Sequence, residues 1–134
     1  MSTFTLEIAT PERLLIREPV SEAQIPARQG EIGVRAEHAP LIAELGIGVL
    51  SYVAEGRHKE LCVGGGVVEV LRDRVRVLAD VAEHADEVDV KRAEEAMRRA
   101  SERLSHPNLG LDVARALNAL HRAQARLRAA GQGR

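Results

Sequence analysis

The chain has 134 residues, of which 45% are hydrophobic, and a formal net charge of −1. This length allows one domain or two small ones. With one Phe, one Tyr and no Trp the core must be aliphatic, and aromatic stacking on nucleic-acid bases is excluded. A single cysteine, Cys62, excludes an intrachain disulfide and suits a reducing compartment. No leader pattern opens the sequence, and the longest apolar stretch, residues 39–54, is too short to span a bilayer, so we expect a soluble chain.

The first 80 or so residues are typical of short strands. Phe4, Leu6 and Ile8 alternate with polar residues, as do Val75 and Val77. Turn signals separate further strands, which we expect at 13–17, 21–27, 47–54, 59–63 and 67–71. The triple glycine at 64–66 predicts a turn or a site of close packing. Strands at this spacing, without helices between them, predict an antiparallel sandwich or barrel.

At about residue 85 the composition changes from glycine and β-branched residues to Ala, Arg and Glu. Residues 88–104 and 111–127 repeat one pattern, sharing Asp, Val, Arg, Ala and Leu at the same offset. Asp86 is a plausible N-cap for the first helix, Asp112 opens the second, and Gly131 and Gly133 end it. The predicted fold is therefore α+β, with a β-sandwich domain at 1–85 and an antiparallel helical hairpin at 86–134.

The predicted seam between the two helices is rich in alanine. Because alanine buries little apolar area, such a seam is stabilised less than a leucine seam, and we expect that the hairpin can open. The stripe on the first helix is Ala93, Ala96, Met97, Ala100 and Leu104, and the stripe facing it is Val113, Leu117, Leu120, Ala123 and Leu127.

Charge is distributed unevenly along the chain. Residues 1–86 hold 14 acidic and 9 basic residues, residues 87–110 are balanced, and residues 111–134 hold one acid and five arginines, a net of +4. Each helix carries an arginine column on one face. These columns, Arg92, Arg99, Arg103 and Arg115, Arg122, Arg126, indicate an anionic partner surface or a phosphate ligand.

Catalytic motifs are missing from the sequence. It contains neither a phosphate-binding G-x-x-x-x-G-K-[ST] loop nor a G-x-S-x-G elbow. The five histidines show no paired metal-ligand spacing, and Cys62 has no cysteine partner. We therefore expect a protein that is not an enzyme, binds no metal and requires no cofactor.

The segment from Gln29 to Leu41 is predicted to be a constrained surface loop between strands. Its string G-E-I-G-V-x-x-x-H-A-P-L resembles the signature loop of the epsilon subunit of F-type ATP synthases, and GGGVVEV followed by VRVLADVAE resembles that family's last two strands. The resemblance implies docking on the membrane rotor ring, with Glu31 and His38 as contacts, and on the gamma subunit. Alternatively, Glu31 stabilises a turn and His38 is solvated. Arg35-Ala36 departs from the Leu-Pro that is common in the family.

A second motif lies in the hairpin, where Val88-Asp89-Val90-Lys91-Arg92-Ala93 resembles the [I/L]-D-x-x-R-A motif of ATP-binding bacterial epsilon subunits. By this resemblance the residues that bind a regulatory ATP are Glu83, Asp89, Arg92, Arg99, Arg122 and Arg126. Guanidinium groups suit phosphate, and a carboxylate can accept a hydrogen bond from an adenine amino group. The alternative is that Asp89 is only a first-turn acid and that the arginines form a solvated face. Residues 111–116 satisfy the motif too.

The resemblance implies a peripheral subunit on the cytoplasmic side of the cell membrane. In such a proton-translocating ATP synthase it belongs to the rotating central stalk and couples rotation to catalysis. Folded on the β domain, the hairpin permits ATP hydrolysis; extended along gamma, its basic second helix meets the catalytic alpha and beta subunits and blocks rotation. One alternative is the same subunit without nucleotide binding, acting as a mechanical brake. A nucleic-acid adaptor is a second alternative, which the acidic body and scarce aromatics argue against.

Overall fold

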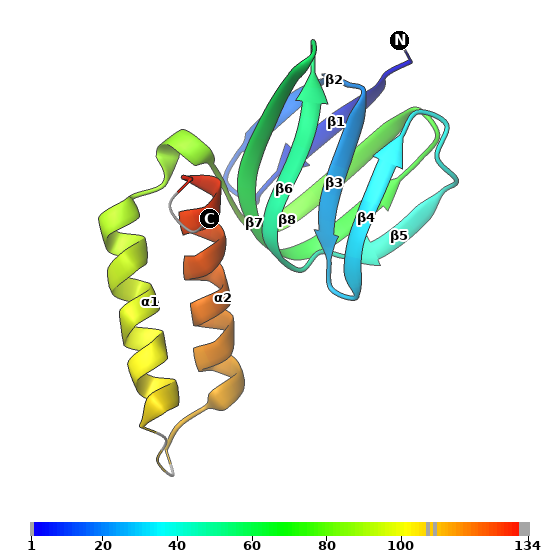
Figure 1. Ribbon diagram of the computed structural model, residues 1–134. Helices are drawn as coiled ribbons and strands as arrows, with labels where there is room; N and C mark the ends of the chain where they lie inside the picture. The colour runs from blue at the N-terminus through cyan, green and yellow to red at the C-terminus, as the bar shows by residue number, and fades with distance from the viewer. Residues whose placement is uncertain (1, 107, 109, 132–134) are drawn as a thin grey trace.

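The computed structural model describes residues 2–106, 108 and 110–131. Within them a β domain precedes a short 3-10 turn and two antiparallel helices (Figure 1). This order confirms the predicted α+β class. The strands are β1 (Phe4–Ala9), β2 (Leu14–Val20), β3 (Glu22–Ala27), β4 (Gly30–Arg35), β5 (Leu41–Glu44), β6 (Ile47–Ala54), β7 (Arg57–Val70) and β8 (Arg74–His84). The helical elements are η1 (Ala85–Glu87), α1 (Val90–Ser105) and α2 (Val113–Ala129).

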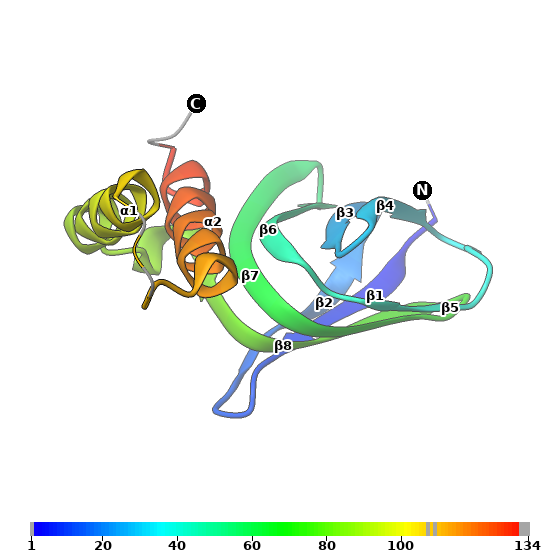
Figure 2. The ribbon, with the colours of Figure 1, turned by 90° about the horizontal axis from the view of Figure 1, so that it is seen from below.

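The strands form one sheet in the order β2-β1-β8-β7-β6-β3-β4, and β5 pairs with β7 off this path. The sheet curls over so that its inner faces enclose the core (Figure 2). The described strand pairs are antiparallel except for β1 and β8, which run parallel. The sequence predicted only antiparallel pairing. β1 and β8 are the first and last strands, so the whole intervening domain serves as the long connection that a parallel pair requires.

The core of the β domain is aliphatic, as the composition requires. Its largest fully buried side chains, none more than 2% exposed, come from both layers of the curled sheet. Alternating burial along β1 and β6 shows why these sequences form strands, because every second side chain enters the core. These core side chains are Leu6, Ile8, Val20, Ile25, Val34, Leu50, Leu61, Val68, Val70, Val75 and Val77.

Strand β7 corrects the expectation of two strands at 59–63 and 67–71 separated by a glycine turn. It is one bent strand, and its first half pairs with β6 while its second half pairs with β5. The bend lies at Gly65 (φ +69°) and Gly66 (φ +121°), where a Cβ on Gly66 would collide with the backbone of Leu78. The close-packing interpretation of the triple glycine is therefore confirmed and the turn interpretation is wrong.

Strands β4 and β5 correct the prediction of a loop over 29–41. Ile32 pairs with Ile25 of β3, and Val34 lies in the core at 2% exposure. The glycines at 30 and 33 weaken the local strand signal, and pairing with β3 overrides it. Gln29 stays in the turn between β3 and β4, and residues 36–40 remain a connection, in which Glu37 has a φ of 66°.

The N-caps of the two helices are Asp89 and Asp112. Each carboxylate accepts a hydrogen bond from the backbone N–H three residues on, Arg92 at 3.1 Å and Arg115 at 3.0 Å. Asp86 lies in η1, so the prediction that it caps the first helix is wrong. Gly131, with a φ of +84°, follows the end of α2 as predicted, whereas Gly133 lies outside the described residues.

The hairpin packs largely through alanine. Ala93 and Ala100 of α1 and Ala123 and Leu127 of α2 are buried, in agreement with the expected stripes. Val113 and Leu117, predicted to line the seam, are instead 52% and 39% exposed. Ala116 is buried in their place, and in the second half of α2 Ala125 and Ala129 are buried against the β domain.

Candidate functional site

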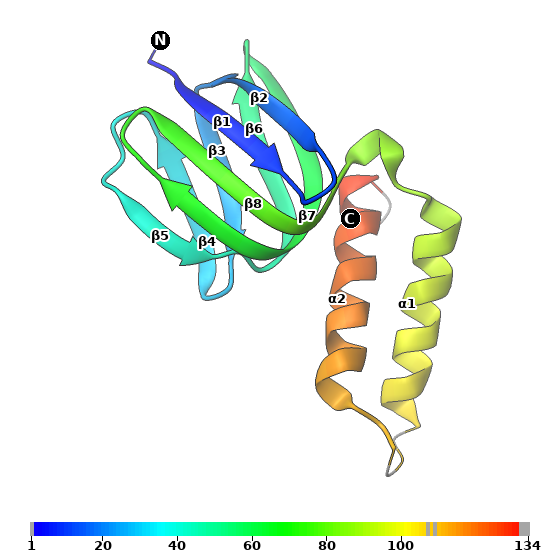
Figure 3. The same cartoon turned by 180° about the vertical axis from the view of Figure 1, so that it is seen from behind.

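Helix α2 rests on strands β6 and β7, while α1 lies on its far side, away from the sheet (Figures 1 and 3). Leu61 and Val63 of β7 point into the core of the β domain, so Cys62 between them points outward. It is nevertheless only 6% exposed, because Ala125 and Ala129 of α2 cover it. Ile47, Val49, Ala85 and Val88 complete this small apolar contact.

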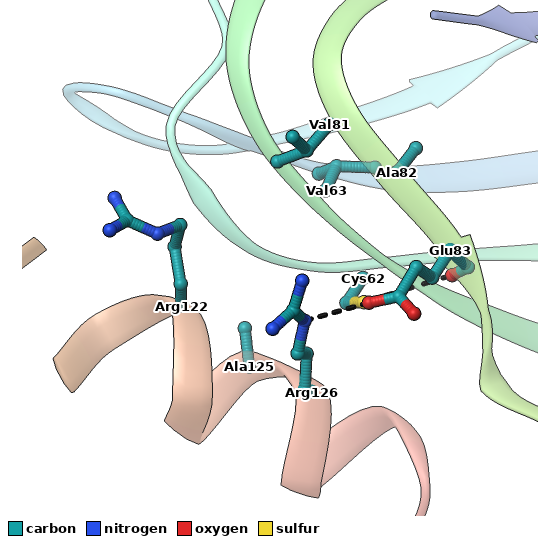
Figure 4. Close-up of a pocket in the computed structure, with 8 residues that line it drawn as sticks. All are labelled: Cys62, Val63, Val81, Ala82, Glu83, Arg122, Ala125 and Arg126. Atoms are coloured by element: carbon teal, nitrogen blue, oxygen red, sulfur yellow. Dashed lines mark hydrogen bonds and ion pairs between the residues drawn. The ribbon is translucent and has the colours of Figure 1, made fainter. Parts of the chain in front are cut away.

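One ion pair accompanies the apolar contact. Arg126 of α2 donates from Nε to Oε1 of Glu83 at the end of β8, at 2.7 Å (Figure 4). The two side chains are 38% and 29% exposed. The thiol of Cys62 lies 3.7 Å from the carbonyl oxygen of Glu83, and burial raises the pKa of this thiol to about 11. Small apolar side chains and the part-buried Arg126–Glu83 ion pair therefore hold α2 against the β domain.

The cavity beside this ion pair is small. It is lined by Glu83, Arg126, Arg122 and apolar neighbours and measures about 20 Å³, room for about one water molecule. Next to it, a larger groove of about 750 Å³ also reaches Arg122 and runs along the glycine bend of β7. Its polar lining includes Arg28, Glu44, Asp80, Asn118 and His121. A groove of this size is in the range of small-molecule sites.

The structure therefore brings together three of the six predicted nucleotide-binding residues, Glu83, Arg122 and Arg126. The other three lie on or beside α1. Asp89 caps that helix, and the side chains of Arg92 and Arg99 are exposed. None of these three lines the cavity or the groove. In this conformation Asp89 has the same capping role as Asp112 in the second copy of the motif.

The two residues predicted to contact a rotor ring are separated by strand β4. Glu31 is exposed near its start and pairs with Pro26 of β3. His38 follows its end, with Nδ1 2.6 Å from the carbonyl oxygen of Ala39. Six residues, 32–37, lie between them in mostly extended chain, so the structure places them toward opposite ends of β4 rather than side by side.

Sequence reasoning missed the contact of Arg13 with Glu87. Arg13, in the β1–β2 turn, forms two hydrogen bonds to the Glu87 carboxylate of η1, at 2.9 and 2.8 Å. These residues are 74 positions apart, and no local pattern marks them. The groove residues Asp80 and His121 were missed for the same reason. Among the described residues, no group of three or more His, Cys, Asp or Glu could hold a metal ion, and no helix is long and apolar enough to cross a membrane.

The structure therefore has two parts, a β domain, which we call the platform, and a helical hairpin docked on it, which we call the arm. Two family models match it, the β-sandwich domain of the ATP synthase delta/epsilon chain over residues 3–85 and the long α-helix domain of the same chain over residues 86–131. The chain therefore belongs to the ATP synthase delta/epsilon family and is a non-catalytic subunit, as the sequence predicted.

Curated relatives agree with this family over nearly the whole chain. The ATP synthase epsilon chain of Solibacter usitatus is 54% identical over 125 residues, which are 93% of each chain. That of Symbiobacterium thermophilum is 47% identical and covers 98% of this chain and 95% of its own. A chain in the Euglena gracilis mitochondrial ATP synthase (OSCP/F1/c-ring) has a similar fold, with a TM-score of 0.81 and 24% identity, covering 96% of this chain and 81% of that one.

Proposed function

We propose that the chain is the rotating epsilon subunit of the central stalk in a bacterial, proton-translocating ATP synthase. It is held at the cytoplasmic side of the cell membrane through that complex, couples rotation to catalysis, and restrains ATP hydrolysis when its hairpin leaves the β domain. The observation that supports this proposal most is the docking of α2, which depends on Ala125, Ala129 and one ion pair. Each buried alanine methyl contributes only about 0.8 kcal/mol. Such an arm can detach without unfolding its platform.

The outer face of the β domain suits a protein partner, and we assign it to the gamma subunit. Leu14, Leu78 and Val67 are 55%, 52% and 44% exposed. Cross-strand register aligns them in one row through Ala9. The neighbouring row alternates in charge, Arg17, Glu7, Arg76 and Glu69. An apolar row beside a charged row is typical of specific interfaces.

The gamma assignment is tested by Leu78→Asp. This side chain points to solvent, so the isolated subunit should stay folded while its affinity for gamma falls at least tenfold. Arg57→Asp, at an exposed position at the start of β7, is the control. Equal affinity for the two variants would contradict the assignment. Glu31 and His38 remain our proposed contacts to the membrane rotor ring.

We further propose that a regulatory ATP binds beside α2 and favours the docked hairpin. Arg126 already has an anionic partner in Glu83, whereas Arg122 lies at the junction of the small cavity and the wide groove. A triphosphate entering through the groove would meet Arg122 first and then compete with Glu83 for Arg126. Asp89, Arg92 and Arg99 line neither space in this conformation, so they would join it only after α1 moves toward the groove. ATP then shifts the equilibrium only by its greater affinity for the docked state.

The alternative is the same stalk subunit without nucleotide binding, whose hairpin acts only as a brake. Two observations favour it: the Glu83–Arg126 pair satisfies its own charges, and Asp89 has a role as helix cap. When extended, the basic α2 would face acidic surface on the catalytic alpha and beta subunits.

Calorimetric titration of the full chain with ATP separates the two proposals. Asp89→Ala with Arg92→Ala should abolish binding and ATP-induced protection of the hairpin, while the β domain stays folded. Asp112→Ala with Arg115→Ala is the matched control, because it removes an equivalent N-cap and arginine from the second copy of the motif. Unchanged binding in the first variant would contradict the nucleotide site.

A further inference from the structure

The connection between the β domain and the hairpin is fastened back to the sheet. Oε1 of Glu87 accepts a hydrogen bond from the backbone N–H of His84 at 2.9 Å and another from Nη2 of Arg13 at 2.8 Å, while Oε2 accepts from Nη1 of Arg13 at 2.9 Å. One carboxylate therefore closes η1 onto the end of β8 and ties it to the β1–β2 turn. We name this arrangement the linker clamp.

The arginine of the linker clamp is presented by an ordered turn. Oγ1 of Thr10 accepts hydrogen bonds from the backbone N–H groups of Glu12 and Arg13, both at 3.3 Å. The backbone N–H of Thr10 in turn donates to the carbonyl oxygen of Arg13 at 2.8 Å. Bidentate pairing of a guanidinium with a carboxylate adds geometric definition to the contact. The hydrogen bonds from Arg13, and next that from the backbone N–H of His84, lower the pKa of Glu87 to about 2, so the carboxylate is ionised at neutral pH.

Beyond the linker clamp, the chain is held less firmly. Val88 and Asp89 have extended backbones, and the backbone N–H of Val88 makes only a long 3.4 Å contact to Ala85. The side chain of Val88 packs against the cluster of Cys62, Ala125 and Ala129, a contact that is lost when α2 leaves. We infer that residues 88–89 are the hinge of the hairpin and that the linker clamp keeps residues 85–87 part of the β domain in both states.

The linker clamp then controls how readily the hairpin docks. With it, the flexible tether is two residues long; without it, residues 85–89 become free and the tether is five. The effective concentration of a tethered group falls roughly as the −3/2 power of tether length, so loss of the linker clamp should lower the docking equilibrium about fourfold. This inference depends on the proposed mobility of the hairpin but not on ATP binding.

Cys62 reports hairpin docking in the full-length chain, because α2 covers it. We would compare Arg13→Gln and Glu87→Ala with Arg17→Gln, a control that removes another exposed arginine paired with a glutamate, Glu7 at 3.6 Å. The two linker-clamp variants should raise the rate of thiol modification by Ellman's reagent about fourfold, and the double variant should raise it no further. A rate equal to that of Arg17→Gln would overturn the inference.

Amide exchange at His84 gives a second readout that does not require undocking, since this N–H donates to Glu87. It should be protected in the parent chain and in Arg17→Gln and lose protection in Glu87→Ala and Arg13→Gln. Unaltered protection in both variants would contradict the linker clamp whatever the thiol kinetics show. If His84 responds as expected but Cys62 reacts only upon global unfolding, the proposed hairpin switch fails, and with it the control of docking by the linker clamp.

Discussion

The β domain and the hairpin are built from different side chains. The β domain buries branched residues such as Leu6, Ile25 and Leu61 at 1% exposure or less, whereas the hairpin buries mainly alanine and Leu127. Opening the interior of branched side chains costs much free energy, whereas each buried alanine of the hairpin contributes only a small amount. One short chain thus combines a rigid platform with an arm that is only lightly attached to it.

The largest expected effect comes from the platform. Leu61→Ala should lower the free energy of unfolding by about 2–5 kcal/mol, because it removes a fully buried side chain and leaves a cavity. Leu117→Ala in the hairpin, at 39% exposure, should cost less than about 1 kcal/mol. Urea unfolding followed by circular dichroism measures both. Similar losses for the two variants would remove the contrast between the regions.

The second-largest effect is expected from a substitution that undocks the arm. Ala125→Glu would bury a carboxylate against Cys62 and close to Glu83, which should weaken docking by about 2 kcal/mol or more and raise thiol modification about thirtyfold. Ala114→Glu, at an exposed position near the start of α2, should have little effect. The free energy of unfolding of the β domain should stay unchanged in both variants. A loss of β-domain stability in Ala125→Glu would show that the two regions fold as one unit.

The ion pair makes a smaller contribution. Arg126 and Glu83 are each about a third exposed, so solvent screens the pair, and Arg126→Gln should weaken docking by about 0.5–1 kcal/mol. A double-mutant cycle with Glu83→Gln, read by thiol modification, measures the coupling. Arg115→Gln, at an exposed arginine near the start of α2 that lines none of these spaces, serves as control. A coupling energy near zero would mean that the ion pair does not contribute and that the apolar contact alone stabilises docking.

The smallest effect concerns pH and the linker clamp. A lowered folded-state pKa means that the clamp's contribution is fully present above the ordinary carboxyl value of about 4.5 and is lost as pH falls toward about 2. The docking equilibrium, taken from rates of Cys62 modification that are corrected for ionisation of the thiol, should therefore not change between pH 5 and 8 on account of Glu87. Carbon NMR titration of Glu87 should give a pKa near 2, rising toward the ordinary value in Arg13→Gln. An ordinary pKa in the parent chain would contradict the bidentate contact.

The sequence predicts most of the architecture because local patterns determine it. Alternation identifies β1 and β8, and the repeated Asp-x-x-Arg-Ala pattern places both helices. It fails where tertiary pairing decides: Gly65 bends a single strand between two partners, and β4 becomes ordered only by pairing with β3. The candidate site likewise has a part that local spacing predicts and a part that only the fold determines. Arginine spacing brings Arg122 and Arg126 together, but the Arg13–Glu87 contact depends on the folded sheet.

Thiol modification of Cys62 under native conditions, followed against urea concentration, tests the detachable arm most directly. If the hairpin detaches locally, the rate at low urea should be almost independent of urea, because little surface is exposed in the opening, and should rise steeply only near global unfolding. A rate that follows the global unfolding slope from zero urea upward would contradict the account, since Cys62 would then be exposed only when the β domain itself unfolds.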